Sequence, residues 1–148
     1  MGIYFHIPFC KKACHYCDFH FSTVLKNRDE MVESLIRELA YRANEWKGQS
    51  VKTIYFGGGT PSLLQEKHWN DLANAIHQYL HLSERVEFTV EVNPDDVSED
   101  ALSVWKSIGV NRLSVGVQSM DDEVLKWMNR AHSAEQAVSA IRLAQENG

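Results

Sequence analysis

The sequence predicts an α/β fold built on a parallel sheet, because short apolar, β-branched runs alternate with longer segments of helical periodicity. Four runs are predicted to be buried strands bounded by turn formers: residues 3–7, 51–56, 86–92 and 112–118. About four βα units make half of an eight-unit barrel or most of a six-unit one. The chain is therefore expected to form either a small open parallel sheet or the N-terminal portion of a larger barrel of TIM type.

Helices are predicted between the strands. Apolar residues recur every three to four positions over 27–46, and Pro61 with Ser62 is predicted to open a second helix. This second helix is expected to carry both His77 and His81, four residues apart, on a solvated face.

Capping residues indicate the later helices. Ser98 is suited to cap the start of a third helix, and Gly109 stands where a glycine would end it. A short helical segment is predicted over 122–128, and Ser133 with Gln136 forms a capping box for a last helix. The four tryptophans fall at the spacing of helical core positions.

The bulk composition is that of an ordinary globular domain, since the 148 residues are 44% hydrophobic and 24% charged. The formal net charge of −5 argues against a broad electrostatic surface for nucleic acid. The N-terminus lacks the charged and long apolar regions of a signal peptide, and no stretch is apolar for long enough to predict a membrane span. Three clustered cysteines then indicate a reducing compartment, and we expect a cytoplasmic protein.

All three cysteines fall in one short loop after the first predicted strand, with the spacing Cys10-x-x-x-Cys14-x-x-Cys17. Three thiolates can hold three irons of a [4Fe–4S] cluster and leave the fourth iron open for another ligand. One alternative is a zinc ion whose fourth ligand is His6, His15 or His20. Three unrelated buried cysteines are a further alternative, against which their clustering argues. Cysteine-only ligation with an open position favours the iron–sulfur cluster.

Each predicted strand is followed at its carboxyl end by an unusual motif. The cysteine loop follows the first strand, and the later strands end at Gly57-Gly58-Gly59-Thr60-Pro61, Glu91-Val92-Asn93-Pro94 and Gln118-Ser119. Ligand sites of parallel α/β folds lie just beyond the carboxyl ends of the strands. The convergence of four motifs on that edge of the sheet therefore predicts a ligand site.

Each motif also has an interpretation that needs no ligand. The glycine run lets the backbone approach a ligand closely, yet a tight turn also uses glycine. Glu91 is placed to accept hydrogen bonds from a ribose, or it is a solvated strand end. Gln118 needs partners for its amide, which either a ligand or an internal network supplies. Arg130, taken alone, is best interpreted as a surface arginine.

Taken together, the cysteine loop, the Gly-Gly-Gly-Thr-Pro run, the Glu-x-Asn-Pro motif and the Val-Gly-Val-Gln-Ser segment resemble the oxygen-independent coproporphyrinogen III oxidase family. That family is a branch of the radical S-adenosylmethionine (SAM) proteins, and the resemblance spans nearly the whole chain. It implies a partial TIM-type radical SAM barrel. Residues 1–148 would be the N-terminal part of the core domain, with the rest of the barrel and the C-terminal domain absent.

The resemblance also implies cofactors and roles for individual residues. The cofactors are a [4Fe–4S] cluster and SAM, and the implied cluster ligands are Cys10, Cys14 and Cys17. The implied residues of the cluster–SAM site are Tyr4, Gly58 and Glu91. The positions that contact a second SAM in the oxidase correspond here to Tyr16, Gly59, Thr60, Gln118 and Arg130. No residue is given a catalytic role.

Two departures from the oxidase pattern indicate the haem-chaperone branch of the family. The oxidase has a further cysteine where this chain has Phe19, and it has an N-terminal extension before its first strand. The chaperone branch implies that haem is bound and passed to client haemoproteins. The alternative is the oxidase itself. Its substrate is a porphyrinogen, coproporphyrinogen III, which it decarboxylates to protoporphyrinogen IX. Either reading implies a low-potential electron donor for the cluster.

The predicted architecture also bears on association. Part of a barrel would leave its fourth strand unpaired and an apolar interior open on one side. Because both surfaces favour contact with another chain, we expect this chain to self-associate.

Overall fold

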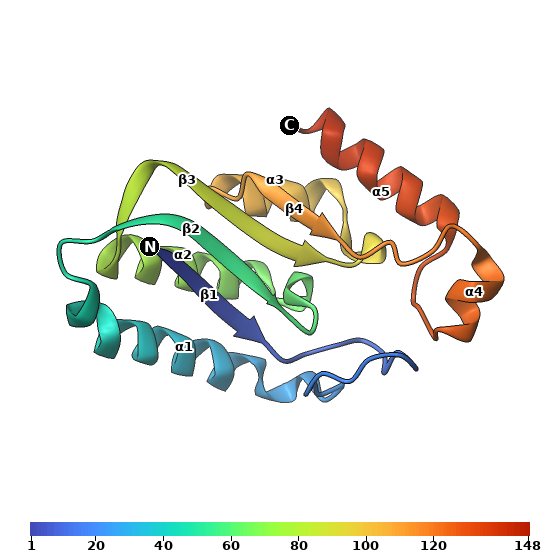
Figure 1. Ribbon diagram of the computed structural model, residues 1–148, viewed down its shortest axis with the longest axis horizontal. Helices are drawn as coiled ribbons and strands as arrows, with labels where there is room; N and C mark the ends of the chain where they lie inside the picture. The colour runs from blue at the N-terminus through green and yellow to red at the C-terminus, as the bar shows by residue number, and fades with distance from the viewer.

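The strands form one open sheet in the computed structural model, which describes residues 1–148 (Figure 1). All neighbouring strands are parallel, and they follow one another in the order β1-β2-β3-β4. The strands are β1 (Gly2–Ile7), β2 (Ser50–Gly58), β3 (His81–Val92) and β4 (Arg112–Val115). This arrangement confirms the predicted α/β fold with a parallel sheet.

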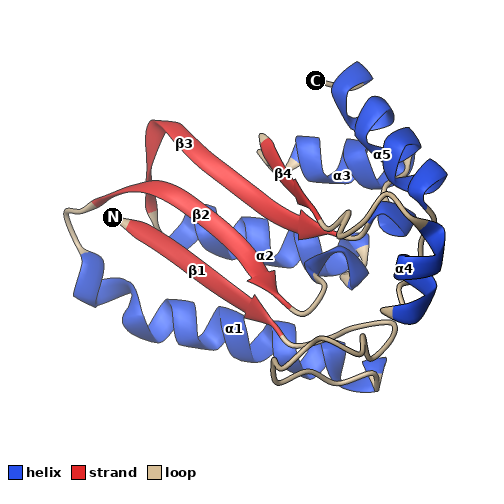
Figure 2. Ribbon diagram, turned by 45° about the vertical axis from the view of Figure 1, so that its right-hand side comes forward, coloured by secondary structure: helices blue, strands red, loops and turns tan.

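Helices connect the strands and cover one face of the sheet (Figure 2). The three that pack on this face are α1 (Arg28–Arg42), α2 (Glu66–Tyr79) and α3 (Glu99–Ser107). Two more follow β4, namely α4 (Asp122–Trp127) and α5 (Ala134–Glu146). None of these helices combines the length and the hydrophobicity that crossing a membrane requires.

Two strand boundaries differ from the prediction. β3 begins at His81, so this residue belongs to a strand and not to the helix that carries His77. The predicted histidine pair on one helix face is therefore wrong. β4 ends at Val115 rather than at residue 118, because a tight turn in which the Val117 N–H donates to the Val115 carbonyl follows at once, and Gln118 then has φ of 66°, which a strand does not allow.

Two helix boundaries differ as well. The segment predicted as one helix over 27–46 is α-helical only to Arg42 and continues as the 3-10 turn Ala43–Trp46. The proline at the predicted start of the second helix opens a separate 3-10 turn, Pro61–Leu63, and α2 begins at Glu66. The proline locks its own φ but does not extend the turn into a helix.

The predicted caps are confirmed. The Ser98 side chain accepts from the backbone of α3, and Gly109 follows that helix with φ of 94°. Ser133 and Gln136 form the predicted capping box of α5. The core role predicted for all four tryptophans is wrong for Trp127, which is 70% exposed on α4.

The two faces of the sheet differ in polarity because side chains alternate along each strand. The face under the helices is apolar and buried, with Phe5, Ile7, Ile54, Phe56, Phe88 and Val90. The alternate positions are polar or tyrosine, with Tyr4, His6, Tyr55, Glu87, Thr89, Glu91 and Arg112. The predicted apolar open interior is therefore wrong. Self-association remains a prediction that rests on the free edge of β4.

A row of phenylalanine rings crosses three strands at the centre of the core. The rings of Phe5 and Phe56 are stacked at 4.4 Å between centroids, and those of Phe56 and Phe88 at 5.6 Å. The ring of Trp69, from α2, meets Phe56 edge-on at 5.2 Å. Phe56 thus contacts both neighbouring strands and the helix layer at once.

Replacing Phe56 by alanine removes the central ring of this row. We expect the free energy of unfolding to fall by about 3–5 kcal/mol, as for other buried phenylalanines, when measured by chemical denaturation. Tyr41→Ala is the control, because Tyr41 is 83% exposed and a surface change costs less than about 0.5 kcal/mol. Equal losses for the two variants would contradict this description of the core.

Candidate functional site

The carboxyl ends of the strands surround a pocket of about 270 Å³. Its walls come from the loops that follow β1, β2, β3 and β4, so the four sequence motifs do converge. The predicted site residues in its lining are Cys10, Cys14, Tyr16, Cys17, Gly58, Gly59, Thr60, Glu91, Gln118 and Arg130. Tyr4 is the one predicted site residue outside this lining.

Backbone hydrogen bonds close the cysteine loop at its base. The N–H of Ser22 donates to the carbonyl of Pro8 at 2.8 Å, and the N–H of Cys10 donates to the carbonyl of Ser22 at 3.0 Å. Within the loop, the N–H of Cys17 donates to the carbonyl of Cys14 at 3.1 Å. All three thiols are free and partly buried, as ligands beside an accessible site need to be.

The positions of these thiols suit a cluster better than a single metal ion. No three His, Cys, Asp or Glu side chains converge closely enough to share one ion. Structural zinc requires that convergence, whereas each thiolate of a [4Fe–4S] cluster binds its own iron.

Polar side chains donate hydrogen bonds to two of the thiols. The Thr60 hydroxyl donates to Cys10 Sγ at 3.6 Å, and Arg130 Nη1 donates to Cys14 Sγ at 3.6 Å. Burial raises the pKa of Cys10, and the Thr60 hydrogen bond and the Arg130 charge act against that rise. Because metals bind the thiolate, Thr60 and Arg130 support the form that ligation requires.

Arg130 is held by contacts with several loops. Its interpretation from the sequence alone, as a surface arginine, is therefore wrong. Its Nη2 donates to Asn93 Oδ1 at 2.8 Å and to the Gly116 carbonyl at 2.9 Å. Its Nη1 lies 3.3 Å from the Tyr16 hydroxyl as well as close to Cys14. The guanidinium therefore joins the ends of β3 and β4 to the cysteine loop.

Glu91 is fixed by two donors at the floor of the pocket. The Tyr55 hydroxyl donates to Oε1 at 2.7 Å, and the Gly58 N–H donates to Oε2 at 3.0 Å. Tyr4 stacks on the Tyr55 ring at 6.0 Å, and burial, followed by the Glu91 charge, raises the pKa of Tyr4. Tyr4 thus lies behind the pocket residues, against Tyr55 and His6.

The glycine run is explained by contacts within the chain. A Cβ at Gly59 would lie 2.6 Å from the carbonyl oxygen of Phe9 and 2.9 Å from that of Ile7. Gly58 has φ of 112°, and a Cβ there would lie 2.6 Å from the His6 ring. The loop after β2 therefore needs glycine in order to pack against the end of β1, whether or not a ligand is bound.

We expect Gly59→Ala to destabilise the chain by about 1–3 kcal/mol, since the new methyl group meets backbone atoms that have no room to move. Thermal and denaturant unfolding measure this loss. Gly116→Ala is the matched control, because its Cβ would first meet the side-chain ends of Arg130 and Gln118 at 3.3 Å, and its nearest backbone contact, the Val92 carbonyl oxygen, lies at 3.6 Å. A Gly59 variant as stable as the wild-type chain would show that this packing argument is wrong.

Gln118 contributes to the pocket from a strained backbone. Its φ of 66° lies in the left-handed region, which costs a non-glycine residue of order 1–3 kcal/mol. Tight turns surround it, because the N–H of Val117 donates to the Val115 carbonyl and that of Ser119 to the Val117 carbonyl. The strain points to a role for this side chain, since glycine would fit the backbone without it.

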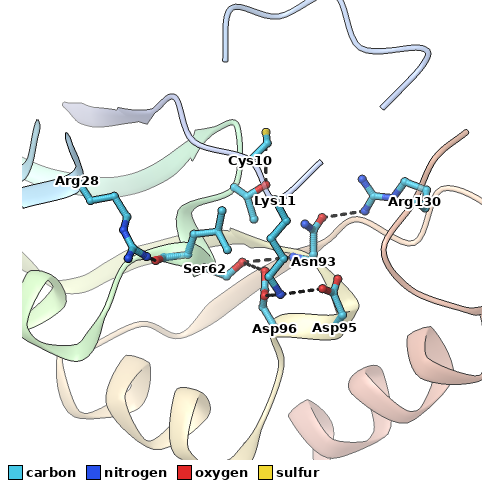
Figure 3. A network of polar contacts seen from close by, with 10 residues as sticks. Cys10, Lys11, Arg28, Ser62, Asn93, Asp95, Asp96 and Arg130 are labelled. Atoms are coloured by element: carbon cyan, nitrogen blue, oxygen red, sulfur yellow. Dashed lines mark hydrogen bonds and ion pairs between the residues drawn. The ribbon is translucent and has the colours of Figure 1, made fainter. Parts of the chain in front are cut away.

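A polar network beneath the cysteine loop was not predicted from the sequence. Lys11 contacts Asp95 and Asp96 in the turn after β3, and the Ser62 hydroxyl donates to Asp96 Oδ2 at 2.6 Å (Figure 3). The opposite charges in the loops after the first and third predicted strands were the available signal. They become informative only once parallel pairing places the two loops at the same edge.

A comparison with known protein families identifies the superfamily of this chain. Residues 4–148 match the radical SAM superfamily, and the chain belongs to that superfamily. Membership implies a [4Fe–4S] cluster and SAM as cofactors. The donor set fits this, with three free cysteines on one loop facing a pocket that also contains a fixed carboxylate.

Within this superfamily, the chain is similar to curated proteins of one kind. The heme chaperone HemW of Bacillus subtilis is 39% identical over 98% of this chain and 39% of its own length. The heme chaperone HemW of Escherichia coli is 39% identical over 100% of this chain and 40% of its own length. The chain therefore spans about two fifths of the length of these curated relatives.

One solved structure is similar to this chain in both fold and sequence. Coproporphyrinogen III oxidase (HemN) from Escherichia coli, a radical SAM enzyme, superposes with a TM-score of 0.91 at 31% identity. The match covers 98% of this chain and 34% of the oxidase chain. The sheet thus corresponds to one part of a TIM-barrel-type enzyme, in agreement with the predicted barrel.

Proposed function

We propose that this chain is the cluster-binding and SAM-binding part of a haem chaperone of the HemW type. The observation that carries the proposal is the pocket in which three free cysteines face Gly58, Glu91 and Arg130. Identity to two HemW proteins over nearly the whole chain, and Phe19 in the place of the further cysteine of the oxidase, support the chaperone branch.

In this proposal Cys10, Cys14 and Cys17 hold the cluster. Gly58 and Glu91 form the part of the SAM site nearest to the cluster. Tyr4 supports Glu91 through Tyr55. When bound, the cluster and SAM together supply radical chemistry, for which the protein provides orientation and exclusion of water.

The remaining site residues predicted from the sequence are assigned to the walls of the same SAM site. They are Tyr16, Gly59, Thr60, Gln118 and Arg130. A separate second SAM is not part of the proposal, because Tyr16 and Arg130 contact each other and Gly59 packs on the end of β1. Thr60 and Arg130 instead donate hydrogen bonds to the sulfur atoms of Cys10 and Cys14.

Anaerobic reconstitution with ferrous iron and sulfide tests the cluster. We expect the wild-type chain to take up about four irons and four sulfides, with a brown absorbance that SAM perturbs. A variant with serine at Cys10, Cys14 and Cys17 is expected to take up none while melting at a similar temperature. Zinc bound without sulfide, or a colourless wild-type chain, would refute the proposed site.

A second candidate function is oxidative decarboxylation of coproporphyrinogen III, which the superposition with HemN favours. The chaperone reading predicts that the reconstituted chain binds haem, observed as a shift of the haem absorbance. It also predicts that coproporphyrinogen III, incubated anaerobically with the chain, SAM and a reductant, is recovered unchanged. Decarboxylated porphyrin in that incubation, absent with the serine variant, would replace the chaperone proposal by the oxidase. Client haemoproteins and a low-potential electron donor are the partners that the chaperone proposal entails.

A further inference from the structure

Lys11 joins the cysteine loop to a pair of almost buried carboxylates. Its Nζ donates to Asp95 Oδ2 at 2.8 Å and also contacts Asp96 (Figure 3). The Asp95 side chain is 13% exposed and the Asp96 side chain is 6% exposed, whereas that of Lys11 is 37% exposed. Lys11 is the only cation that pairs with either carboxylate, and the other oxygen of Asp95 is buried with no partner.

From Asp96 the contacts continue across the ends of the strands. The Ser62 hydroxyl, in the loop after β2, donates to Asp96 Oδ2 at 2.6 Å, and the Asn93 N–H, at the end of β3, lies 3.4 Å from the Ser62 oxygen. Arg130 then donates to Asn93 Oδ1 at 2.8 Å and to Cys14 Sγ at 3.6 Å. The contacts therefore leave the cysteine loop at Lys11 and return to it at Cys14.

We infer that Lys11 is a positioning residue, which fixes the segment from Cys10 to Cys14 before the cluster binds. The inference deepens the proposed function and rests on it, because it concerns how the proposed cluster ligands are held. Cys10 directly precedes Lys11, so the ion pair ties the first thiol to the turn after β3. Ordering the loop in advance reduces the entropy that cluster binding would otherwise cost.

An ordinary surface ion pair would not have this effect, because exposed pairs contribute little. Here the two carboxylates are adjacent, nearly buried and dependent on one cation. Removing that cation leaves two neighbouring like charges without a counter-ion in a poorly solvated turn, which is costly. The loop is then expected to lift away from the turn, since Lys11 is its side-chain link to it.

The test uses residues 1–148 in two states, without the cluster and after reconstitution with it. Lys11→Met keeps the length of the side chain and removes the charge, Lys11→Arg keeps the charge, and Lys47→Met is the control on an exposed lysine with no ion pair. In the cluster-free chain we expect Lys11→Met to speed hydrogen exchange at the amide of Cys10 roughly fivefold, without changing exchange in β2 and β3. Lys11→Arg and Lys47→Met should exchange at the wild-type rate.

In the reconstituted chain, Lys11→Met is expected to lose iron to a chelator roughly fivefold faster than the wild type. Adding Asp96→Asn to Lys11→Met should slow that loss again, since it removes one of the two unpaired charges. Unchanged exchange in Lys11→Met, or a parallel rise throughout the sheet, would overturn the inference. A wild-type chain that takes up no cluster would overturn the proposed function, and the exchange rates would then still decide whether Lys11 holds the loop.

Discussion

Parallel pairing of the four strands is the constraint on which the rest of the structure depends. It brings the carboxyl ends of β1 to β4 to one edge, so that loops far apart in the sequence meet around one pocket. The helices pack on one face of the sheet and leave most of the polar side chains of the other face at least partly exposed, with Thr89 the buried exception. Chemistry is therefore confined to the edge and the open face, while stability comes from the apolar face.

The second constraint is the close approach of the backbone after β2 to the backbone at the end of β1. The loop after β2 packs so tightly against the end of β1 that a single methyl group at Gly59 has no space. The same approach lets the Gly58 N–H reach Glu91, which Tyr55 holds from the other side. One packing requirement thus both shapes the floor of the pocket and orients its carboxylate.

The charges around the cysteine loop divide into two functions. Arg130 and Thr60 lie against sulfur atoms, and their charge and hydrogen bond oppose the rise that burial causes in the pKa of Cys10. Lys11 instead contacts Asp95 and Asp96, and it holds the loop in place. A radical SAM protein needs both, because its cluster ligands have to be charged as well as correctly spaced, and in this chain different residues meet the two needs.

The sequence by itself determined the fold class, the strands and most helix caps, because periodicity and capping are local properties. It also determined the cysteine motif and the convergence of four motifs at one edge, which follows from parallel pairing alone. Only the tertiary structure decided that the open face is polar, that His81 begins a strand, and that Arg130 and Lys11 are held by the loops. These features depend on contacts between residues up to 116 positions apart, and neither the periodicity nor the spacing of a single segment records which distant side chain it will meet.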